Sequence, residues 1–167
     1  MKRILLTGMS GTGKSTLLAK LARSAFAALA ARGYLAVDMD EPGWSEHAAD
    51  DDWIWREDRV QEFLVQEVGD ALFVSGCATN QVKFYPQFDA IVLLSAPASV
   101  LIERLATRTN NQYGKHPDEL AEVLVYLETV EPLPRRRATH EIDTSAPFEE
   151  VLATVLRIVA DKGCARR

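Results

Sequence analysis

A glycine-rich stretch at residues 8–16, GMSGTGKST, constrains the fold of this chain more than any other feature. It follows residues 3–7, a short and mostly apolar run that predicts a buried strand. From Lys14 onward, leucine and alanine recur at helical spacing among other good helix formers. The stretch therefore joins a strand to the N-terminus of a helix.

The N-terminus of a helix attracts an anion, because its N–H groups are unpaired and it carries the positive end of the helix dipole. Glycines let the backbone wrap closely around that anion. Lys14 adds a charge for the terminal phosphates, and Ser15 offers a hydroxyl to Mg²⁺. The spacing G-x-x-x-x-G-K-[ST] is that of the phosphate-binding P-loop, and a glycine turn without a ligand is the alternative. We predict that the phosphates are bound by Gly8, Ser10, Gly11, Thr12, Gly13, Lys14, Ser15 and Thr16.

Composition places this unit in an ordinary globular domain. The chain has 167 residues, of which 47% are hydrophobic and 26% charged. Its formal net charge of −5 disfavours bulk nucleic acid as a partner. No apolar run approaches the roughly 18 residues of a membrane span. Cys77 and Cys164 lie far apart in sequence, which indicates neither a disulfide framework nor a metal site. We expect a cytoplasmic protein, a monomer or a homodimer, with no membrane partner.

Apolar runs and helical patterns alternate along the whole chain, which predicts an α/β fold with a doubly wound sheet. Unbroken apolar runs such as IVLL indicate parallel strands covered on both faces. The segment from 40 to 52, which contains Pro42-Gly43, is expected to be a loop. The expected strands are 3–7, 34–38, 71–74, 89–94 and 140–143, and the expected helices are 14–31, 55–67, 97–108, 117–130 and 147–160.

Ligands in such sheets collect at the carboxyl ends of the strands. The P-loop follows the first strand, and Asp38 and Asp40 follow the second in the string VDMDEPGW. Gly76 follows the third strand in a tight turn. The two carboxylates are candidates for metal binding and acceptor binding, and the alternative is that they are turn or cap residues.

Four motifs give the chain a resemblance to a known family: GMSGTGKST, VDMD, RLATRT and HEIDTSAP. In this order they resemble the small P-loop kinases of the shikimate kinase, gluconate kinase and nucleoside monophosphate kinase group. The resemblance implies one three-layer domain over 1–167 with five parallel strands in the order 2-3-1-4-5. It also implies a short lid near 109–117 and a substrate-binding helix region near 44–69.

The resemblance assigns roles to residues outside the P-loop. Asp38 would hold Mg²⁺ through water together with Ser15, and Asp40 would hold the acceptor hydroxyl. The third strand, ALFVSGC, ends without an aspartate, which leaves Asp38 as the metal partner. By the same resemblance Arg104, Arg108, Ala146 and Pro147 would bind ATP, with Lys14, Asp40 and Arg108 catalytic. The acceptor would be bound by Asp40, Trp44, Arg56, Gly76 and Arg136, although the run Arg135-Arg136-Arg137 leaves the register of the arginine open.

The predicted activity is that of an ATP-dependent kinase that phosphorylates a small hydroxylated metabolite, as the shikimate kinases do. Trp44, Trp53 and Trp55 lie within twelve residues, which indicates either core packing or a flat, larger acceptor. A nucleoside or nucleotide kinase is therefore one alternative, and an ATP-binding switch or ATPase without a small acceptor is another. ATP is favoured over GTP because the chain contains no N-K-x-D string.

Overall fold

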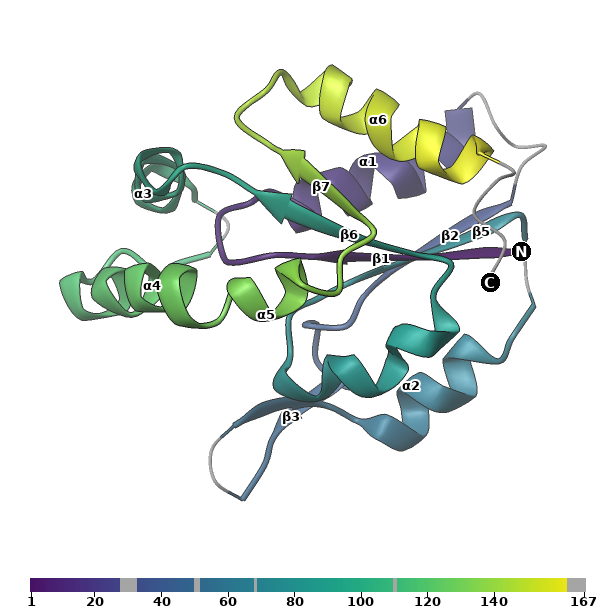
Figure 1. Ribbon diagram of the computed structural model, residues 1–167, viewed down its shortest axis with the longest axis horizontal. Helices are drawn as coiled ribbons and strands as arrows, with labels where there is room; N and C mark the ends of the chain where they lie inside the picture. The colour runs from purple at the N-terminus through teal and green to yellow at the C-terminus, as the bar shows by residue number, and fades with distance from the viewer. Residues whose placement is uncertain (28–32, 50–51, 68, 110, 162–167) are drawn as a thin grey trace.

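A five-stranded parallel sheet forms the centre of the molecule (Figure 1). The computed structural model describes residues 1–27, 33–49, 52–67, 69–109 and 111–161. The strands lie in the order β2-β5-β1-β6-β7, which is 2-3-1-4-5 when the strands of this sheet alone are counted, as predicted. Their bounds are β1 (Lys2–Thr7), β2 (Tyr34–Asp38), β5 (Ala71–Ser75), β6 (Ala90–Ser95) and β7 (His140–Asp143).

Helices cover both faces of the sheet and make three layers (Figure 1). One face carries α1 (Lys14–Ala27) and α6 (Phe148–Ala160), and the other carries α2 (Glu57–Leu64) and the 3₁₀ segment η1 (Thr79–Gln87). Side chains of β1 alternate between the two layers, because successive side chains of a strand point to opposite faces. Ile4 and Leu6 pack in the core beneath α1 and α6, and Leu5 packs in the core beneath α2. Within the described residues no helix has the length and apolar character to cross a membrane.

The carboxyl ends of the strands face a further group of elements (Figure 1). These are α3 (Ala98–Thr107), α4 (Pro117–Thr129) and α5 (Pro132–Arg135), together with a hairpin of β3 (Ser45–His47) and β4 (Trp53–Trp55). The strands of the hairpin pair antiparallel, with Ser45 opposite Trp55. The predicted ligand-binding edge is therefore bounded by the hairpin, by η1 and by the segment that connects α3 to α4.

The hairpin corrects the expected organisation of residues 40–55. The prediction of a loop over 40–52 was wrong for β3, and the predicted helix begins at Glu57 rather than at Trp55. Strands of three residues are too short to show an alternating pattern, and a two-stranded hairpin is marginal without further support. Here Asn80 supplies that support, because its side chain accepts a hydrogen bond from Trp55 N (2.8 Å) and donates one to Trp55 O (2.9 Å).

Most other elements match their predicted bounds to within one residue. The segments η1 and α5 were not predicted, because both contain proline and neither has an apolar repeat. The predicted end of the first helix, near residue 31, lies outside the described residues.

Candidate active site

The P-loop follows β1 and leads directly into α1, as the sequence indicates. Gly13 has a φ of +90°, a left-handed conformation that L side chains resist, and this glycine carries the backbone into the helix. Lys14 lies over the loop, and its Nζ donates to the carbonyl oxygens of Gly8 (2.6 Å) and Met9 (3.3 Å). Thr12 Oγ1 also donates to Met9 O, at 2.8 Å. The lysine charge is thus held above the N-terminus of α1, where a phosphate group is favoured.

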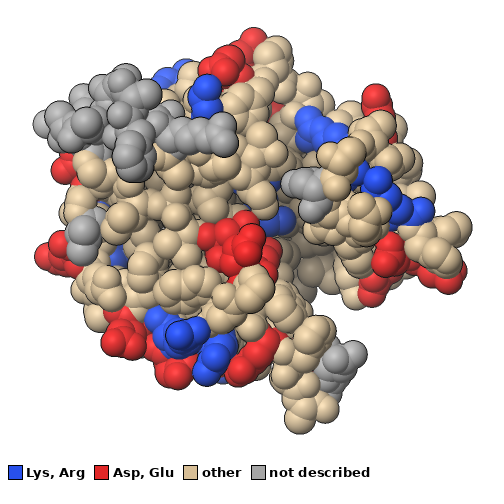
Figure 2. Space-filling view, turned by 180° about the vertical axis from the view of Figure 1, so that it is seen from behind, with Lys and Arg blue, Asp and Glu red and all other residues tan. Residues whose placement is uncertain are grey.

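A cavity of about 600 Å³ opens from the P-loop along the carboxyl edge of the sheet. Figure 2 shows the molecule hollowed beside the part that carries α3 and α4, with acidic and basic side chains at the rim. The cavity is of the size of a small-molecule site. The predicted site residues that line it are Ser10, Gly11, Thr12, Gly13, Lys14, Ser15, Thr16, Asp38, Asp40, Arg104, Arg108 and Ala146.

Two side-chain oxygens that could bind a metal, from Ser15 and Asp38, lie close together at the predicted metal site. Ser15 Oγ donates to Asp38 Oδ2 at 3.1 Å, and Asp38 Oδ1 accepts from Asp40 N at 3.1 Å. A hydroxyl and a carboxylate are suitable ligands for Mg²⁺, which commonly binds one or two protein oxygens together with substrate phosphates. The residues present therefore fit the predicted magnesium site.

Asp40 lies deeper than Asp38, and its carboxylate is held from several sides. Cys77 N donates to Asp40 Oδ1 at 3.2 Å, and the Trp53 side chain also forms a hydrogen bond to this carboxylate. Burial raises the pKa of Asp40 above the ordinary value of an aspartate, and the charge of Asp38 adds to the rise. The Lys14 charge and the two hydrogen bonds oppose it. A largely buried carboxylate with a raised pKa is a stronger base than an exposed one.

Gly76 provides the space that Asp40 and the tryptophans occupy. A Cβ at this position would lie 2.9 Å from Trp55 Cζ2 and 3.0 Å from Asp40 Oδ1. Trp55 is fully buried, at 0% exposure, and its Nε1 has no hydrogen-bond partner among the described residues. The glycine after β5 thus lets an indole ring pack directly behind the carboxylate.

The chain belongs to the AAA domain family. The AAA domain family model (AAA_18) matches residues 4–125, most of the chain. The chain is 28% identical to shikimate kinase 2 of Yersinia enterocolitica over 180 aligned positions, covering 95% of this chain and 96% of that protein. This match bears out the resemblance to small P-loop kinases and the predicted class of enzyme, a phosphotransferase.

Solved structures show the same fold for this member of the AAA domain family. Shikimate kinase from Acinetobacter baumannii, in complex with shikimate, gives a TM-score of 0.62 at 19% identity, covering 96% of this chain and 93% of that one. A gluconokinase from Sinorhizobium meliloti 1021 gives a TM-score of 0.60 at 21% identity, covering 95% of this chain and 91% of that one.

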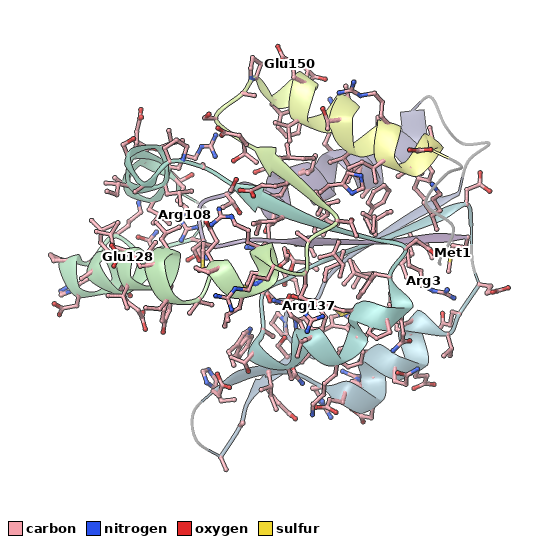
Figure 3. The ribbon with its side chains drawn as sticks, in the orientation of Figure 1. Met1, Arg3, Arg108, Glu128, Arg137 and Glu150 are labelled. Carbon is pink, nitrogen blue, oxygen red and sulfur yellow. The ribbon has the colours of Figure 1, made fainter. Side chains whose placement is uncertain are left out.

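Two arginines of the segment RLATRT face the cavity from α3 and its C-terminus. Arg104 donates to Gly11 O (3.4 Å) and to Thr144 Oγ1 (2.9 Å), so it braces the P-loop against the turn after β7. Arg108 Nη2 donates to Tyr113 O, and its Nε is buried without a partner among the described residues. Burial lowers the pKa of Arg108 from its ordinary value. Figure 3 shows Arg108 between α3 and α4, at the edge of the sheet opposite Arg3.

The three consecutive arginines after α4 have different surroundings. Arg135 Nη2 donates to Glu131 Oε1 (2.7 Å) and Glu141 Oε1 (2.9 Å), which directs it away from the cavity. Arg136, the residue predicted to bind the acceptor, is exposed and does not line the cavity. Arg137 lies where α5 approaches η1 (Figure 3), and its positive charge interacts electrostatically with Tyr85. Burial raises the pKa of Tyr85 to about 12, Cys77 adds to the rise, and Arg137 opposes it.

The remaining residues predicted to bind the acceptor lie around the hairpin rather than in the cavity. Trp44 packs edge-on against Phe63, with ring centroids 5.1 Å apart. Arg56 Nε lies 3.6 Å from Glu46 Oε2 on the hairpin, in a partly exposed ion pair. Of the two alternatives for the tryptophans, core packing and a flat acceptor, packing therefore accounts for Trp44 and Trp55.

At the far end of the cavity, the sequence indicated only part of the lining. Ala146 lines the cavity, whereas the neighbouring Pro147 does not and instead precedes α6. Phe148, at the start of α6, contributes an aromatic ring that the sequence analysis missed. Its place directly after the motif DTSAP was the available signal. The other cavity residues that were missed are Leu17, Glu41, Leu94, Thr107, Asn111, Thr144 and Val151.

Proposed function

We propose that this protein is an ATP-dependent kinase that transfers the γ-phosphoryl group to a hydroxyl of a small hydroxylated metabolite. The observation that carries the proposal is the position of Asp40 at the P-loop end of the cavity, within the electrostatic reach of Lys14. A P-loop alone binds a nucleotide, whereas a basic carboxylate beside the terminal phosphates provides a place for an acceptor hydroxyl.

In this proposal each charged residue has a distinct task. Lys14 and Arg108 stabilise the charge on the transferring phosphoryl group, because fixed cations are effective in a partly desolvated site. Asp40 orients the acceptor hydroxyl and receives its proton. Ser15 and Asp38 would hold Mg²⁺, which neutralises charge on the β- and γ-phosphates when it is bound. The adenosine end of ATP would extend from the P-loop toward Phe148 and Ala146.

The relatives support a small acceptor. The two solved neighbours named above are a shikimate kinase bound to shikimate and a gluconokinase, and both names point to small hydroxylated acids as acceptors. Trp55 is buried, Trp44 packs edge-on against Phe63 and Trp53 packs against His47, so each ring already has a packing role within the protein. These observations favour the small metabolite over a nucleoside or nucleotide as the acceptor.

The deciding experiment is to measure ADP release from Mg-ATP with a panel of acceptors. The panel contains shikimate, gluconate, other hydroxylated acids, nucleosides and nucleoside monophosphates. We expect one class of hydroxylated acid to raise ADP release well above the rate without acceptor. A rise with nucleosides or nucleoside monophosphates would replace the proposal with a nucleoside or nucleotide kinase. A slow rate with every acceptor, despite ATP binding, would favour the ATPase or switch.

A further inference from the structure

Glu122, on α4, joins a tyrosine of its own helix, Tyr126, to a tyrosine of the segment that precedes the helix, Tyr113. Its Oε2 accepts a hydrogen bond from Tyr113 Oη at 2.8 Å, and its Oε1 accepts one from Tyr126 Oη at 2.7 Å. The two hydrogen bonds lower the pKa of Glu122. Burial raises the pKa of Tyr113 and the hydrogen bond to Glu122 adds to that rise, whereas for Tyr126 the hydrogen bond to Glu122 is the main cause of a raised pKa. Glu122 is therefore an ionised acceptor for both hydroxyls at neutral pH, and bonds to a charged acceptor are the stronger kind.

Tyr113 connects this cluster to the cavity through its backbone. Its carbonyl oxygen accepts a hydrogen bond from Arg108 Nη2, and its own N–H donates to Asn111 Oδ1 at 2.8 Å. The Tyr113 carbonyl thus holds the guanidinium of Arg108 at one of its nitrogens. Arg108 lines the cavity with a buried Nε that has no partner among the described residues. A buried donor without a partner is costly, and a phosphate oxygen would satisfy it.

The first turns of α4 hold the same segment at a second point. Glu119 Oε2 accepts hydrogen bonds from Gly114 N (2.8 Å) and His116 N (3.3 Å). Glu119 and Glu122 are three residues apart and so lie on one side of the helix. Glu119 fixes the backbone of the segment after Tyr113, whereas Glu122 fixes the Tyr113 side chain. Glu122 is exposed to solvent, where water could satisfy its carboxylate, yet both of its oxygens accept hydrogen bonds from tyrosine hydroxyls.

We propose that Glu122 is a positioning residue for the phosphate-binding arginine. By accepting both tyrosine hydroxyls, it fixes Tyr113, and the Tyr113 carbonyl in turn keeps the guanidinium of Arg108 directed into the nucleotide cavity. Glu122 itself does not contact the nucleotide. This inference rests on the proposed function, since Arg108 needs a phosphate group to act on.

The test is a double-mutant cycle in which the affinity for Mg-ATP is measured by titration calorimetry. The variants are Glu122→Ala, Arg108→Ala and their combination. We expect Glu122→Ala to weaken Mg-ATP binding about threefold to tenfold in the normal chain and to have almost no effect when Arg108 is already alanine. A residue that acts only through the stability of α4 would lower binding by the same factor in both backgrounds, and that result would overturn the proposal.

Glu128→Ala is the matched control, because Glu128 is an exposed glutamate of the same helix (Figure 3). Its side chain has no hydrogen bond or ion pair to another described residue, and we expect binding to be unchanged. Tyr113→Phe removes one of the two hydroxyls and should reproduce most of the loss, whereas Tyr126→Phe should have a smaller effect. If Glu122→Ala binds Mg-ATP as tightly as Glu128→Ala, the positioning role is wrong and the kinase proposal stands. If the normal chain binds no Mg-ATP, the proposed function fails and this inference fails with it.

Discussion

The two ends of the candidate active site are built in different ways. At the nucleotide end the phosphate-binding loop is a run of nine consecutive residues, 8–16, which offers backbone N–H groups and one lysine. The proposed acceptor end combines Asp40 after β2 with Trp55 of the hairpin and Gly76 after β5. A contiguous motif carries its geometry in its own sequence. An assembled site depends on how distant segments pack, and this is where substrate choice can change while the phosphate chemistry is retained.

The largest expected effect is at the nucleotide end. Lys14→Ala should lower phosphoryl transfer by about 100-fold to 1,000-fold, because it removes a fixed cation from the developing charge. The fold should be retained, since the Lys14 side chain bonds only to carbonyl oxygens of its own loop among the described residues. Steady-state kinetics and a thermal melt measure both effects. Lys20→Ala, an exposed position on α1, is the control. Normal turnover in Lys14→Ala would refute the P-loop assignment.

At the acceptor end, Asp40→Asn should lower turnover by about 100-fold or more, because general-base catalysis contributes about that much. Mg-ATP binding should change far less, which separates the two ends of the site. Binding is measured by calorimetry and turnover by ADP release with the acceptor found in the panel. Asp58→Asn on α2 is a matched control at an exposed position. Equal losses in ATP binding and turnover would mean that Asp40 serves the metal or the fold.

Asp40 should also make both the stability of the protein and its turnover depend on pH. The raised pKa means that the folded chain holds a proton on Asp40 at pH values where the unfolded chain has lost it. The contribution of Asp40 to stability is thus fully present below its unfolded pKa, near 3.8, and is lost as pH rises through the higher folded pKa. Turnover should rise over this window as the base ionises. Urea melts from pH 4 to 7 should show the fall in stability, and rate profiles over the same range should show the rise in turnover. Both trends should be flatter in Asp40→Asn. If the normal chain became more stable than Asp40→Asn as the pH rises, the raised pKa of Asp40 would be contradicted.

A smaller effect is expected at Gly76. Alanine there would place a methyl group 2.9 Å from Trp55 Cζ2 and 3.0 Å from Asp40 Oδ1. Overpacking of this kind costs about 1–3 kcal/mol, and we expect the free energy of unfolding to fall by that amount. The KM for the acceptor should rise while the KM for ATP stays nearly constant. Ser75→Ala is the control, because the buried Ser75 hydroxyl has no partner among the described residues and its loss should be neutral. An unchanged acceptor KM in Gly76→Ala would place the acceptor elsewhere.

The smallest expected effect is on the alkylation rate of the Cys77 thiol. Burial raises the pKa of Cys77, and the charge of Asp40 adds to the rise while Lys14 opposes it. Since the thiolate is the reactive form, Cys77 should react with iodoacetamide more slowly than free cysteine at pH 8. A Cys164→Ser background leaves Cys77 as the remaining cysteine of the chain, and mass spectrometry follows the alkylation. Alkylation as fast as that of free cysteine would show that this part of the acceptor end is open.

The same contrast explains what could be predicted from the sequence. The P-loop, the five strands of the main sheet and the pair Asp38 and Asp40 were predicted because each depends on local pattern and on the order of elements. The hairpin was missed because its pairing is stabilised by Asn80, 25 positions after Trp55. The hydrogen bond between Tyr113 and Glu122 was missed for a similar reason, although the spacing of Glu122 and Tyr126 by four residues was visible. The register of the three arginines depended on which acidic partners lay nearby in space, Glu131 and Glu141.

The side chain of Asn80 has a further consequence for the molecule as a whole. Its carboxamide offers the same pair of groups as a peptide bond, and it pairs with both the N–H and the C=O of Trp55. Asn80 therefore takes the place of one residue of a neighbouring strand along the open side of the hairpin. Exposed strand edges are sites where chains add to one another and aggregate. A single amide thus covers part of the open side of the hairpin, so loss of Asn80 would expose backbone groups to pairing between chains as well as loosen Trp55.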